Sequence, residues 1–382
     1  MQSMVSEKNV LVIGGGLAGL TAALHLNKSG MEVTVVERHG YPRHKVCGEY
    51  VSNEVLPYFD WLGINFQALS PSNLRTLRYT TLSGRVLESQ LPLGGFGLSR
   101  YAMDELLYRV LLSRGVKVVF DAVREVSYHN ERFSVTTASG SIFRAAVVIG
   151  AFGKLSALSK KGKNVARASS PAVAVKAHYR YDGDFPAEEV SLHNFSGGYC
   201  GVSMVENHQL NICYLADYAS FKKSGNIKTF QQNVLKGNRF LKEVLERSTI
   251  IGEGPVSVGQ LSFGRQPAVQ DHMLMIGDTA GLIHPLCGNG MAMAVGSAKV
   301  SCELIVAFLR DGLLGRKEME SRYQKAWNEA FGNRMWAARM LSALGKSTVL
   351  QGMAMESLGR FPLLFKKMIE STHGKPISIK GL

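Results

Sequence analysis

The sequence lacks long apolar runs, paired cysteines and a full complement of acidic residues. No apolar stretch approaches the ~18 residues of a spanning helix, and residues 1–9 have no apolar signal core, so neither a membrane span nor a secretion signal is expected. The five cysteines are odd in number and form no C-x-x-C pair. This pattern argues against a disulfide scaffold or a zinc site, predicts that no metal is bound, and favours a cytoplasmic protein.

The shortage of acidic residues leaves a net charge of +14. No basic run interleaves with aromatic residues, so nucleic acid is not the expected partner. Anionic cofactors, a carrier-bound substrate or an anionic membrane surface explain the charge equally well. Residues 311–382 hold twelve Lys and Arg against six Asp and Glu, and residues 361–369 are an apolar stretch that contains Lys366 and Lys367. Two interpretations stay open: a solvated helix face, or peripheral contact with a membrane or carrier protein.

The most informative segment is the glycine-rich stretch at residues 10–19. The apolar run Val10–Ile13 predicts a buried parallel strand, and the glycines at 14, 16 and 19 then fit G-x-G-x-x-G. Leucines at helical spacing follow, so the turn should open a helix whose N-terminus faces phosphates. Residues 31–36 read as a second strand, and Glu37 at its end is placed to accept a hydrogen bond from a ribose hydroxyl. Strand, turn, helix, strand and acid in this order predict a dinucleotide site.

Further elements follow from the pattern of apolar residues. A loop at 40–49 is followed by a hairpin (75–81 and 85–91) and a helix (99–114) capped by Ser99. Strands are expected at 116–120, 122–128, 133–137, 146–149, 172–179, 190–195, 199–205, 209–215 and 272–276, and helices at 229–246, 290–309 and 322–344. The alternating strands after residue 170 predict an antiparallel sheet with one solvated face, with the histidines at 178, 193 and 208 solvated rather than ligands.

A second strand–loop–helix signal lies at residues 272–290. Gly277 and Asp278 follow a short apolar strand, and such a pair can hydrogen-bond a polyol such as ribityl. The amides of residues 289–291, at the start of the next helix, can face a developing anion. A ribose contact and a ribityl contact then lie at opposite ends of one cofactor, and with a single dinucleotide fingerprint in the chain we expect that cofactor to be FAD.

These residues resemble the flavoprotein superfamily of p-hydroxybenzoate hydroxylase-type monooxygenases (the group A flavoprotein monooxygenases) and geranylgeranyl reductases. The resemblance rests on the glycine turn with Glu37, on Tyr41-Pro42-Arg43-His44-Lys45-Val46-Cys47-Gly48-Glu49, on Leu98-Ser99-Arg100 with Asp104, and on Gly277-Asp278 through Pro285 to Gly288-Asn289-Gly290. It covers residues 8 to about 310. The Pro-Arg-x-Lys-x-Cys-Gly stretch is its more specific part and leans toward the geranylgeranyl reductase and halogenase-like branch.

The resemblance implies residue roles. Glu37 would bind the adenosine ribose, Arg100 the diphosphate and Asp278 the ribityl chain, while Val123 would contact the adenine side through its backbone. Lys45 and Cys47 would lie near the isoalloxazine. The cofactor site expected from motifs and resemblance together comprises Gly14, Gly16, Leu17, Ala18, Gly19, Glu37, Arg38, Lys45, Arg100, Val123, Gly277, Asp278, Pro285, Gly288, Asn289, Gly290 and Met291.

The chain also departs from the family. Ala151-Phe152-Gly153 replaces a common Ala-Asp-Gly whose Asp helps the hydroxylase branch use a nicotinamide cofactor. This departure leaves the mode of flavin reduction open. Because the chain has a single dinucleotide fingerprint, NAD(P)H or another electron donor is expected to act only as a transient reductant. The halogenase Trp-x-Trp-x-Ile-Pro element is missing, and of the geranylgeranyl reductases' Tyr-x-Trp-x-Phe-Pro-like strand only Tyr199 has a counterpart.

Three functions are compatible with these features. The first is hydroxylation of an apolar or aromatic small molecule through a flavin hydroperoxide, which needs a dry pocket. The second is reduction of a carbon–carbon double bond as in geranylgeranyl reductases, which needs a proton donor near the flavin; Cys47, Tyr199 and His284 are the candidate catalytic residues. The third is a non-enzymatic electron carrier or sensor, which would not need the inserted sheet as a substrate pocket.

The predicted fold class is α/β. A Rossmann-like FAD-binding domain of the glutathione reductase type (residues 1–70, 98–156 and 255–310) would carry an inserted antiparallel-sheet substrate domain (71–97 and 157–254). Residues 311–382 would form a C-terminal helical region. The protein is thus expected to be a flavoprotein oxidoreductase.

Overall fold

A six-stranded sheet is built around the strand predicted from residues 10–13. The computed structural model describes residues 9–153, 158, 172–261, 263–344 and 362–379. Within them the sheet has the order β17–β18–β10–β1–β2–β6, parallel except for β17. The strands are β1 (Asn9–Ile13), β2 (Glu32–Glu37), β6 (Lys117–Phe120), β10 (Val147–Gly150), β17 (Val269–Gln270) and β18 (Met273–Met275).

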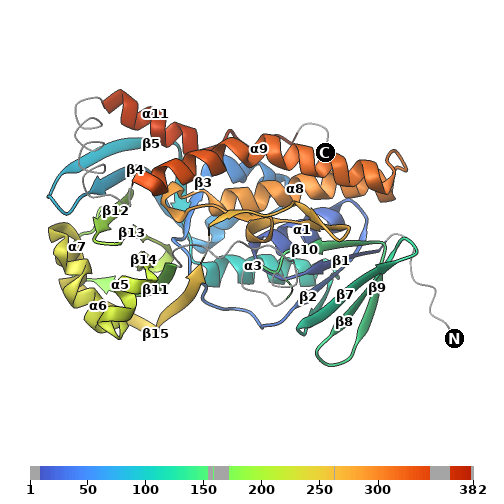
Figure 1. Cartoon of the computed structure of the whole chain (residues 1–382), viewed down its shortest axis with the longest axis horizontal. Coiled ribbons are helices and arrows are strands. Elements are labelled where there is room, and N and C mark those ends of the chain that lie inside the picture. Colours follow the sequence, from blue (N-terminus) through green and yellow to red (C-terminus); the bar gives the residue numbers. More distant parts are fainter. Residues whose placement is uncertain (1–8, 154–157, 159–171, 262, 345–361, 380–382) are drawn as a thin grey trace.

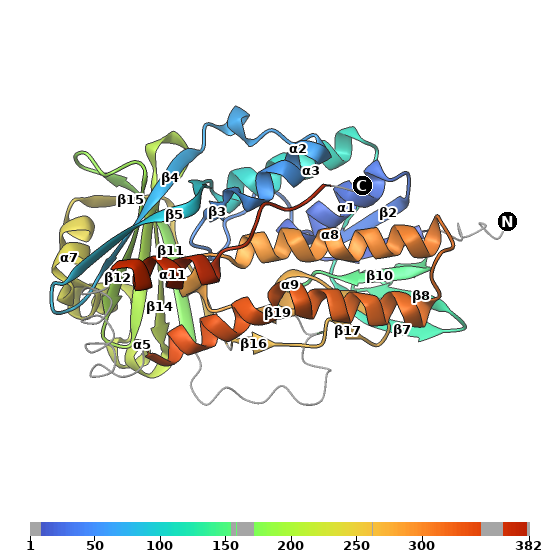
Figure 2. The ribbon, with the colours of Figure 1, turned by 90° about the horizontal axis from the view of Figure 1, so that it is seen from above.

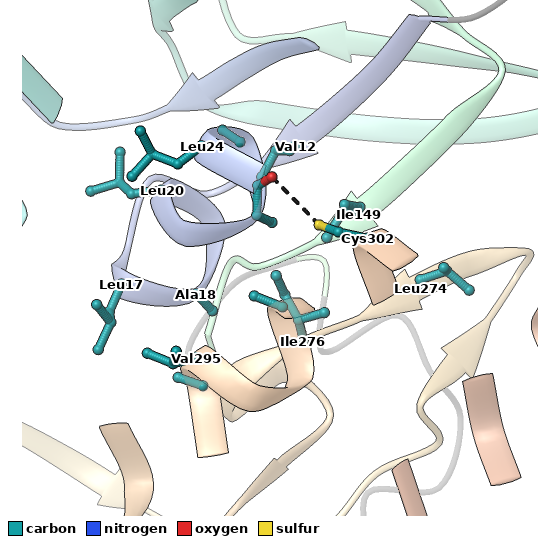
Figure 3. Close-up of a cluster of buried hydrophobic side chains, with 14 of the residues drawn as sticks. Val12, Leu17, Ala18, Leu20, Leu24, Ile149, Leu274, Ile276, Val295 and Cys302 are labelled. Carbon is teal, nitrogen blue, oxygen red and sulfur yellow. Dashed lines mark hydrogen bonds between the residues drawn. The ribbon is translucent and has the colours of Figure 1, made fainter. Parts of the chain in front are cut away.

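Helices α1 and α8 bury the centre of this sheet. Val12, Ile149 and Leu274 from three neighbouring strands share one apolar cluster with Val295 of α8 (Figure 3). The Cys302 thiol of α8 donates to the Ala22 carbonyl of α1 at 3.4 Å, so the two helices touch closely. The main helices of this half are α1 (Leu17–Lys28), α2 (Leu56–Leu62), α3 (Arg100–Ser113), α8 (Gly290–Leu309) and α9 (Arg316–Leu344).

Helix α8 is longer and more apolar overall than the expected absence of long apolar runs suggests. By length and composition it is the one helix in the described chain that could cross a membrane. Its small residues instead pack against α1, and Val295, Ala298, Cys302 and Ile305 are almost completely shielded from solvent. Scattered polar residues such as Ser297 and Ser301 interrupt the run, which is why the sequence shows no unbroken apolar stretch.

A three-stranded antiparallel sheet packs beside the parallel one. It consists of β7 (Val123–His129), β8 (Arg132–Thr137) and β9 (Ile142–Ala145). Phe133 and Val135 of β8 belong to the same buried cluster as β1 and β10. Strand β9 was not predicted; it is short, and its Ile142 is exposed.

The second half of the molecule is an eight-stranded sheet, order β15–β11–β14–β13–β12–β4–β5–β3. Figure 1 shows it beside the parallel sheet, with α8 and α9 running along the top. Only the β12–β4 pair is parallel; the others are antiparallel. The strands are β3 (Tyr50–Ser52), β4 (Ser72–Thr80), β5 (Val86–Gly97), β11 (Ala172–Tyr181), β12 (Glu189–Phe195), β13 (Gly198–Met204), β14 (Leu210–Asp217) and β15 (Ser248–Leu261).

The sequence-based expectation of a solvated sheet face is wrong for strand β11. Every residue of β11 from 172 to 179 is buried, including Lys176 and His178. One face packs against helices α5 (Tyr218–Ser224), α6 (Ile227–Asn233) and α7 (Arg239–Glu246). On the other face, the loop at 44–49 covers Lys176 and His178. His193 is buried too, whereas His208 is exposed as predicted.

The helix predicted over 229–246 is two helices. Asn238 lies between α6 and α7, directly before the first residue of α7. Its Oδ1 accepts hydrogen bonds from the amides of Phe240 and Leu241 and so caps α7. Its Nδ2 donates to Thr80 Oγ1 at 3.0 Å and so ties the break to β4. An Asn that can cap locally competes with helix continuation, a tertiary choice that apolar spacing does not reveal.

The C-terminal region packs on both halves. Helix α9 begins at Arg316, six residues before the predicted start at residue 322, and α11 (Pro362–Thr372) lies alongside β5 and the end of α9 (Figure 2).

The α/β fold class with an added, mainly antiparallel sheet is confirmed. Strand β3 of segment 1–70 and the end of β15 beyond residue 254 belong to the second sheet, while the boundary at residues 156 and 157 lies outside the described residues. One further two-residue ladder pairs β16 (Gly264–Arg265) with β19 (Gly281–Leu282).

Candidate functional site

The glycine turn between β1 and α1 presents an open backbone surface at a helix N-terminus. Gly14 has φ 104°, and a Cβ there would overlap the backbone that follows β10. A Cβ at Gly19 would overlap the carbonyl oxygen of Gly14, so α1 sits directly on the turn. At Gly16 a Cβ would meet only Lys45 Nζ at 3.8 Å and the Arg100 guanidinium at 3.9 Å. This space, flanked by two cations, fits a diphosphate.

Glu37 is the last residue of β2, and its side chain lies against the glycine turn. Its carboxylate accepts from the amides of Gly15 (2.6 Å) and His39 (3.0 Å), and Arg43 lies 3.7 Å away. An ionised carboxylate has about four acceptor positions, so these two amides leave capacity for a ribose hydroxyl. The Glu37 side chain also lines the cavity described below, as the predicted ribose contact requires.

Two cations and one carboxylate stand beside the turn. Ser99 caps α3, and Arg100 in its first turn binds Asp104 through two hydrogen bonds of 2.9 Å, while Lys45 reaches the same carboxylate at 2.7 Å. Burial alone would raise the pKa of Asp104, but the two cations outweigh it and hold that pKa below its usual value. Burial lowers the pKa of Lys45, partly offset by Asp104. One positive charge is left without a counter-charge within this trio, which suits an anionic diphosphate.

The second strand–loop–helix unit packs beside the glycine turn, since a Cβ at Gly277 would lie 3.0 Å from the Cβ of Ala18 in α1. Gly277 has φ 59° and its amide donates to Ser297 Oγ at 2.9 Å, which fixes the short 3-10 turn Gly277–Thr279 after β18. Asp278 lines the cavity, and its charge reaches Arg100. A second 3-10 turn, Pro285–Cys287, leads through Gly288 (φ 64°) into α8.

A cavity of about 640 Å³ joins this cradle to the eight-stranded sheet. Its floor is the sheet face, to which seven adjacent strands contribute. Neighbouring strands lie ~4.8 Å apart, so six steps give a floor roughly 29 Å long. The floor residues, one for each strand, include Val258, Ala174, Leu215, Tyr199, Leu192, Leu77 and Leu91. Apolar side chains dominate, as in sites for poorly soluble ligands.

Helix α11 forms the wall at the β5 end of the cavity. Phe365, Met368 and Ile369 of α11 line it. The end of α11 is held by Asn289, whose Nδ2 donates to the Thr372 carbonyl at 2.6 Å, and by His373, whose ring nitrogen lies 3.2 Å from the Tyr50 hydroxyl. Sequence reasoning missed this wall, because an apolar stretch with two lysines does not reveal what it covers.

Most of the predicted cofactor residues surround one space. Those that line the cavity are Gly14, Gly16, Leu17, Ala18, Glu37, Arg38, Lys45, Arg100, Gly277, Asp278, Pro285, Gly288, Gly290 and Met291. Gly19, Asn289 and Val123 do not line it. Gly19 packs on the turn, Asn289 is fully buried and holds α11, and Val123 begins β7.

Cys47, the first of the three candidate catalytic residues, lies beside the predicted cofactor residue Met291. It lines the cavity, its thiol lies 3.7 Å from Met291 Sδ, and it accepts from the Glu49 amide at 3.4 Å. Burial is the main reason that the pKa of Cys47 is raised. The side chain is therefore a thiol at neutral pH, able to give a proton but a poor nucleophile.

Tyr199 of β13 and His284 form a pair of neighbouring rings. Their rings lie 5.8 Å apart, and the His284 ring also packs 4.8 Å from Phe263. Tyr199 lines the cavity, whereas His284 is not among the residues that line it. If this pair moves a proton, Tyr199 is the member that can touch a substrate.

A buried ionic cluster of Glu49, Lys176 and His178 was missed by sequence reasoning. Glu49 carboxylate oxygens lie 2.9 Å from Lys176 Nζ and 2.7 Å from His178 Nε2. The alternation of residues 172–179 placed Lys176 and His178 on one face correctly, but the covering loop is distant in sequence. The Cys-Gly-Glu ending of the family motif was the one available signal.

The chain is similar to several known proteins. A family model described as pyridine nucleotide-disulphide oxidoreductase matches residues 9–70. Digeranylgeranylglycerophospholipid reductase 2 of Methanothermobacter thermautotrophicus is 24% identical over 388 residues, covering 93% of this chain and 95% of that protein. An FAD-dependent monooxygenase of Penicillium canescens is 28% identical over 177 residues, 43% of this chain and 37% of that protein. The solved structure of a flavin-dependent brominase matches with TM-score 0.80 at 19% identity, covering 98% and 95% of the two chains, so the fold is shared.

Proposed function

We propose that this chain, an oxidoreductase of the FAD-dependent superfamily, hydroxylates an apolar or aromatic small molecule. The observation that carries the proposal is the cavity, which leaves the predicted flavin cradle and continues over an apolar sheet face. A bound flavin would supply the redox chemistry with oxygen as co-substrate. Hydroxylation of this kind needs neither a metal nor a strong base, but it does need water to be excluded.

Residues of this chain have distinct tasks in that reaction. Gly14, Gly16 and Arg100 would hold the diphosphate, and Glu37 the ribose. The sheet face would orient the substrate and exclude water, because Ala174, Leu192, Leu215 and their neighbours offer it no hydrogen bonds. Tyr199 would be one of the polar side chains that the substrate meets on this face, together with Tyr79 and Ser203.

Reduction of a carbon–carbon double bond is the second candidate. It is supported by Cys47, a protonated thiol in the cavity wall that could supply a proton after hydride transfer. It is also supported by the similarity to the Methanothermobacter thermautotrophicus reductase over nearly the full length of both chains. A carrier or sensor without its own substrate is less well supported, because it would not need so large an apolar cavity.

The deciding experiment is anaerobic reduction of the purified yellow protein by NADPH and by NADH, followed by exposure to air with a panel of aromatic and isoprenoid compounds. The proposal expects reduction by a nicotinamide nucleotide, peroxide release without substrate, and oxygen-dependent product with one. Saturation of an alkene under anaerobic conditions after chemical reduction, with no oxygenated product in air, would replace it by the second candidate. A colourless protein that does not bind added FAD would overturn both.

We also propose a peripheral membrane contact through α11. Phe365 and Ile369 of this helix face inward, while Leu363 is 76% and Leu364 is 52% exposed, and Lys366 and Lys367 are exposed beside them. A helix with apolar groups on its outer side, flanked by lysines, suits the surface of an anionic membrane. An apolar substrate could then enter where α11 walls the cavity.

The cytoplasm is the proposed compartment. Cys47, Cys200, Cys213 and Cys302 are all free thiols in the described chain, and Cys200 and Cys302 are fully buried. Free, unpaired thiols are typical of reducing compartments.

A further inference from the structure

Glu49 links three parts of the molecule that meet beside Cys47. It ends the loop at 44–49 with φ 55°, a left-handed conformation unusual for a glutamate, and its side chain is fully buried. One carboxylate oxygen lies 2.9 Å from Lys176 Nζ of β11 and accepts from the Arg100 amide of α3 at 2.9 Å. The other lies 2.7 Å from His178 Nε2. Such contacts over-determine an otherwise strained backbone.

The same loop is tied to the next strand of the sheet. Asn211 of β14, the register partner of His178, donates through Nδ2 to the Cys47 carbonyl at 3.2 Å. The Glu49 amide donates to Cys47 Sγ at 3.4 Å. Loop, sheet and α3 therefore fix the position of the thiol together.

We infer that Glu49, paired with Lys176 and His178, is a positioning residue that orients the Cys47 loop and sets the charge around the Cys47 thiol. The inference rests on the proposed flavin site, since it concerns a residue of that cavity. Its test needs no turnover, and the flavin content of each preparation reports separately on the proposed function.

The charges around the thiol explain why the carboxylate matters. Titratable and charged groups face the Cys47–Glu49 segment from every packed element, namely His44 and Lys45 in the loop, Arg100 in α3, Lys176 and His178 in β11, and Cys213 in β14. Glu253 of β15 reaches His44, and Asp278 reaches Arg100. Burial has the largest effect on the pKa of Cys47 and raises it. Of the neighbouring charges, those of Arg100 and Lys176 lower this pKa, whereas that of Glu49 raises it. Removing the Glu49 charge therefore leaves two cations that stabilise a thiolate.

The carboxylate itself stays ionised. Burial alone would raise the pKa of Glu49, but the hydrogen bond from His178 and the charge of Lys176 outweigh burial and lower it. Glu49 thus provides a constant negative charge at neutral pH. An amide in its place would keep the size and one acceptor but lose the charge.

The test is the rate at which iodoacetamide alkylates Cys47 as a function of pH, followed peptide by peptide by mass spectrometry on the purified protein. In E49Q the alkylation rate of Cys47 at pH 7.5 should rise about three- to fourfold for each unit by which its pKa falls, because the larger thiolate fraction is partly offset by the lower nucleophilicity of that thiolate. E49D, which keeps the charge, should retain the wild-type profile. K176Q removes a cation instead and should make alkylation of Cys47 slower than in the wild type. E49Q and K176Q should therefore change the alkylation rate in opposite directions.

The control is E54Q, which neutralises another buried glutamate whose ion pair is with Arg334, 3.1 Å away. E54Q should lose stability but leave the Cys47 profile unchanged. An unchanged profile in a folded E49Q, or the same change in E54Q, would overturn the inference. If E49Q does not fold, K176Q decides: faster alkylation in K176Q would contradict the assigned signs.

Discussion

At the residue scale, the glycine turn depends on contacts that a single methyl group would break. Gly19 lies in α1, where a Cβ would overlap the Gly14 carbonyl oxygen. We predict that G19A loses about 1–3 kcal/mol of unfolding free energy, as overpacked sites do, and binds FAD at least several-fold more weakly because the turn must shift. Urea unfolding and an FAD titration measure both effects.

Gly332 provides the matched control. It also lies inside a helix, α9, but a Cβ there would meet no atom within 4 Å. G332A should therefore stabilise the protein by about 0.5–1 kcal/mol through helix propensity and leave FAD binding unchanged. Equal effects of the two substitutions would show that close packing of the turn is not what Gly19 provides.

Glu37 is the other residue whose role can be isolated. E37Q keeps an acceptor for the Gly15 amide but loses the charge offered to a ribose hydroxyl, so the Kd for FAD should rise about tenfold, the equivalent of ~1.4 kcal/mol for a charged hydrogen bond. Fluorescence quenching on FAD titration measures it. E32Q, at the exposed start of the same strand, should have no effect. FAD binding by E37Q equal to wild type would remove Glu37 from the ribose site.

At the element scale, α11 is the segment whose two sides have different tasks. We predict that the protein sediments with phosphatidylglycerol vesicles and much less with phosphatidylcholine vesicles. The double variant L363N/L364N should lose most of this binding, because apolar insertion and the charges of Lys366 and Lys367 act together.

The control for this prediction is L313N. Leu313 is 73% exposed in the turn after α8, so it matches the α11 leucines in exposure but not in place. L313N should bind vesicles like the wild type. Undiminished binding by L363N/L364N would show that α11 is not the membrane-facing surface.

Another element-scale feature is the sheet that the sequence predicted as half solvated. Alternation correctly placed Lys176 and His178 on one face, because side chains of a strand point alternately to its two faces. Whether that face meets water depends on a loop about 130 residues earlier. The same limit applies to the helix break at Asn238, where a bond to Thr80 of β4 decides the outcome.

At the scale of the whole molecule, two buried neutral histidines should make stability depend on pH. Burial lowers the pKa of His25, beside the Tyr58 hydroxyl, and of His193, beside Thr80, each to about 3. Between pH 6.5 and 3 the unfolded chain therefore binds more protons than the folded one. The free energy of unfolding should fall as pH drops through this range, by at most about 1.4 kcal/mol per pH unit for each histidine.

Urea unfolding at several pH values between 4 and 7 measures this slope. H193Q, which keeps a polar side chain for Thr80, should flatten it, whereas H208Q, at an exposed position, should not. A wild-type slope in H193Q would mean that His193 is protonated in the folded protein.

The sequence by itself determined the dinucleotide turn, the capped helix at Ser99 and the apolar strands, because each depends on residues within a few positions of one another. It also indicated that most of the predicted cofactor residues lie around one space, since Gly14–Gly19 and Gly277–Gly290 are two local motifs that a parallel sheet brings to the same edge. Only the tertiary structure decided that Glu49 meets Lys176 and His178, that α11 walls the cavity, and that Asn289 holds α11. These contacts join segments 80 or more residues apart, and they depend on which surfaces pack together to bury apolar area, which no local pattern specifies.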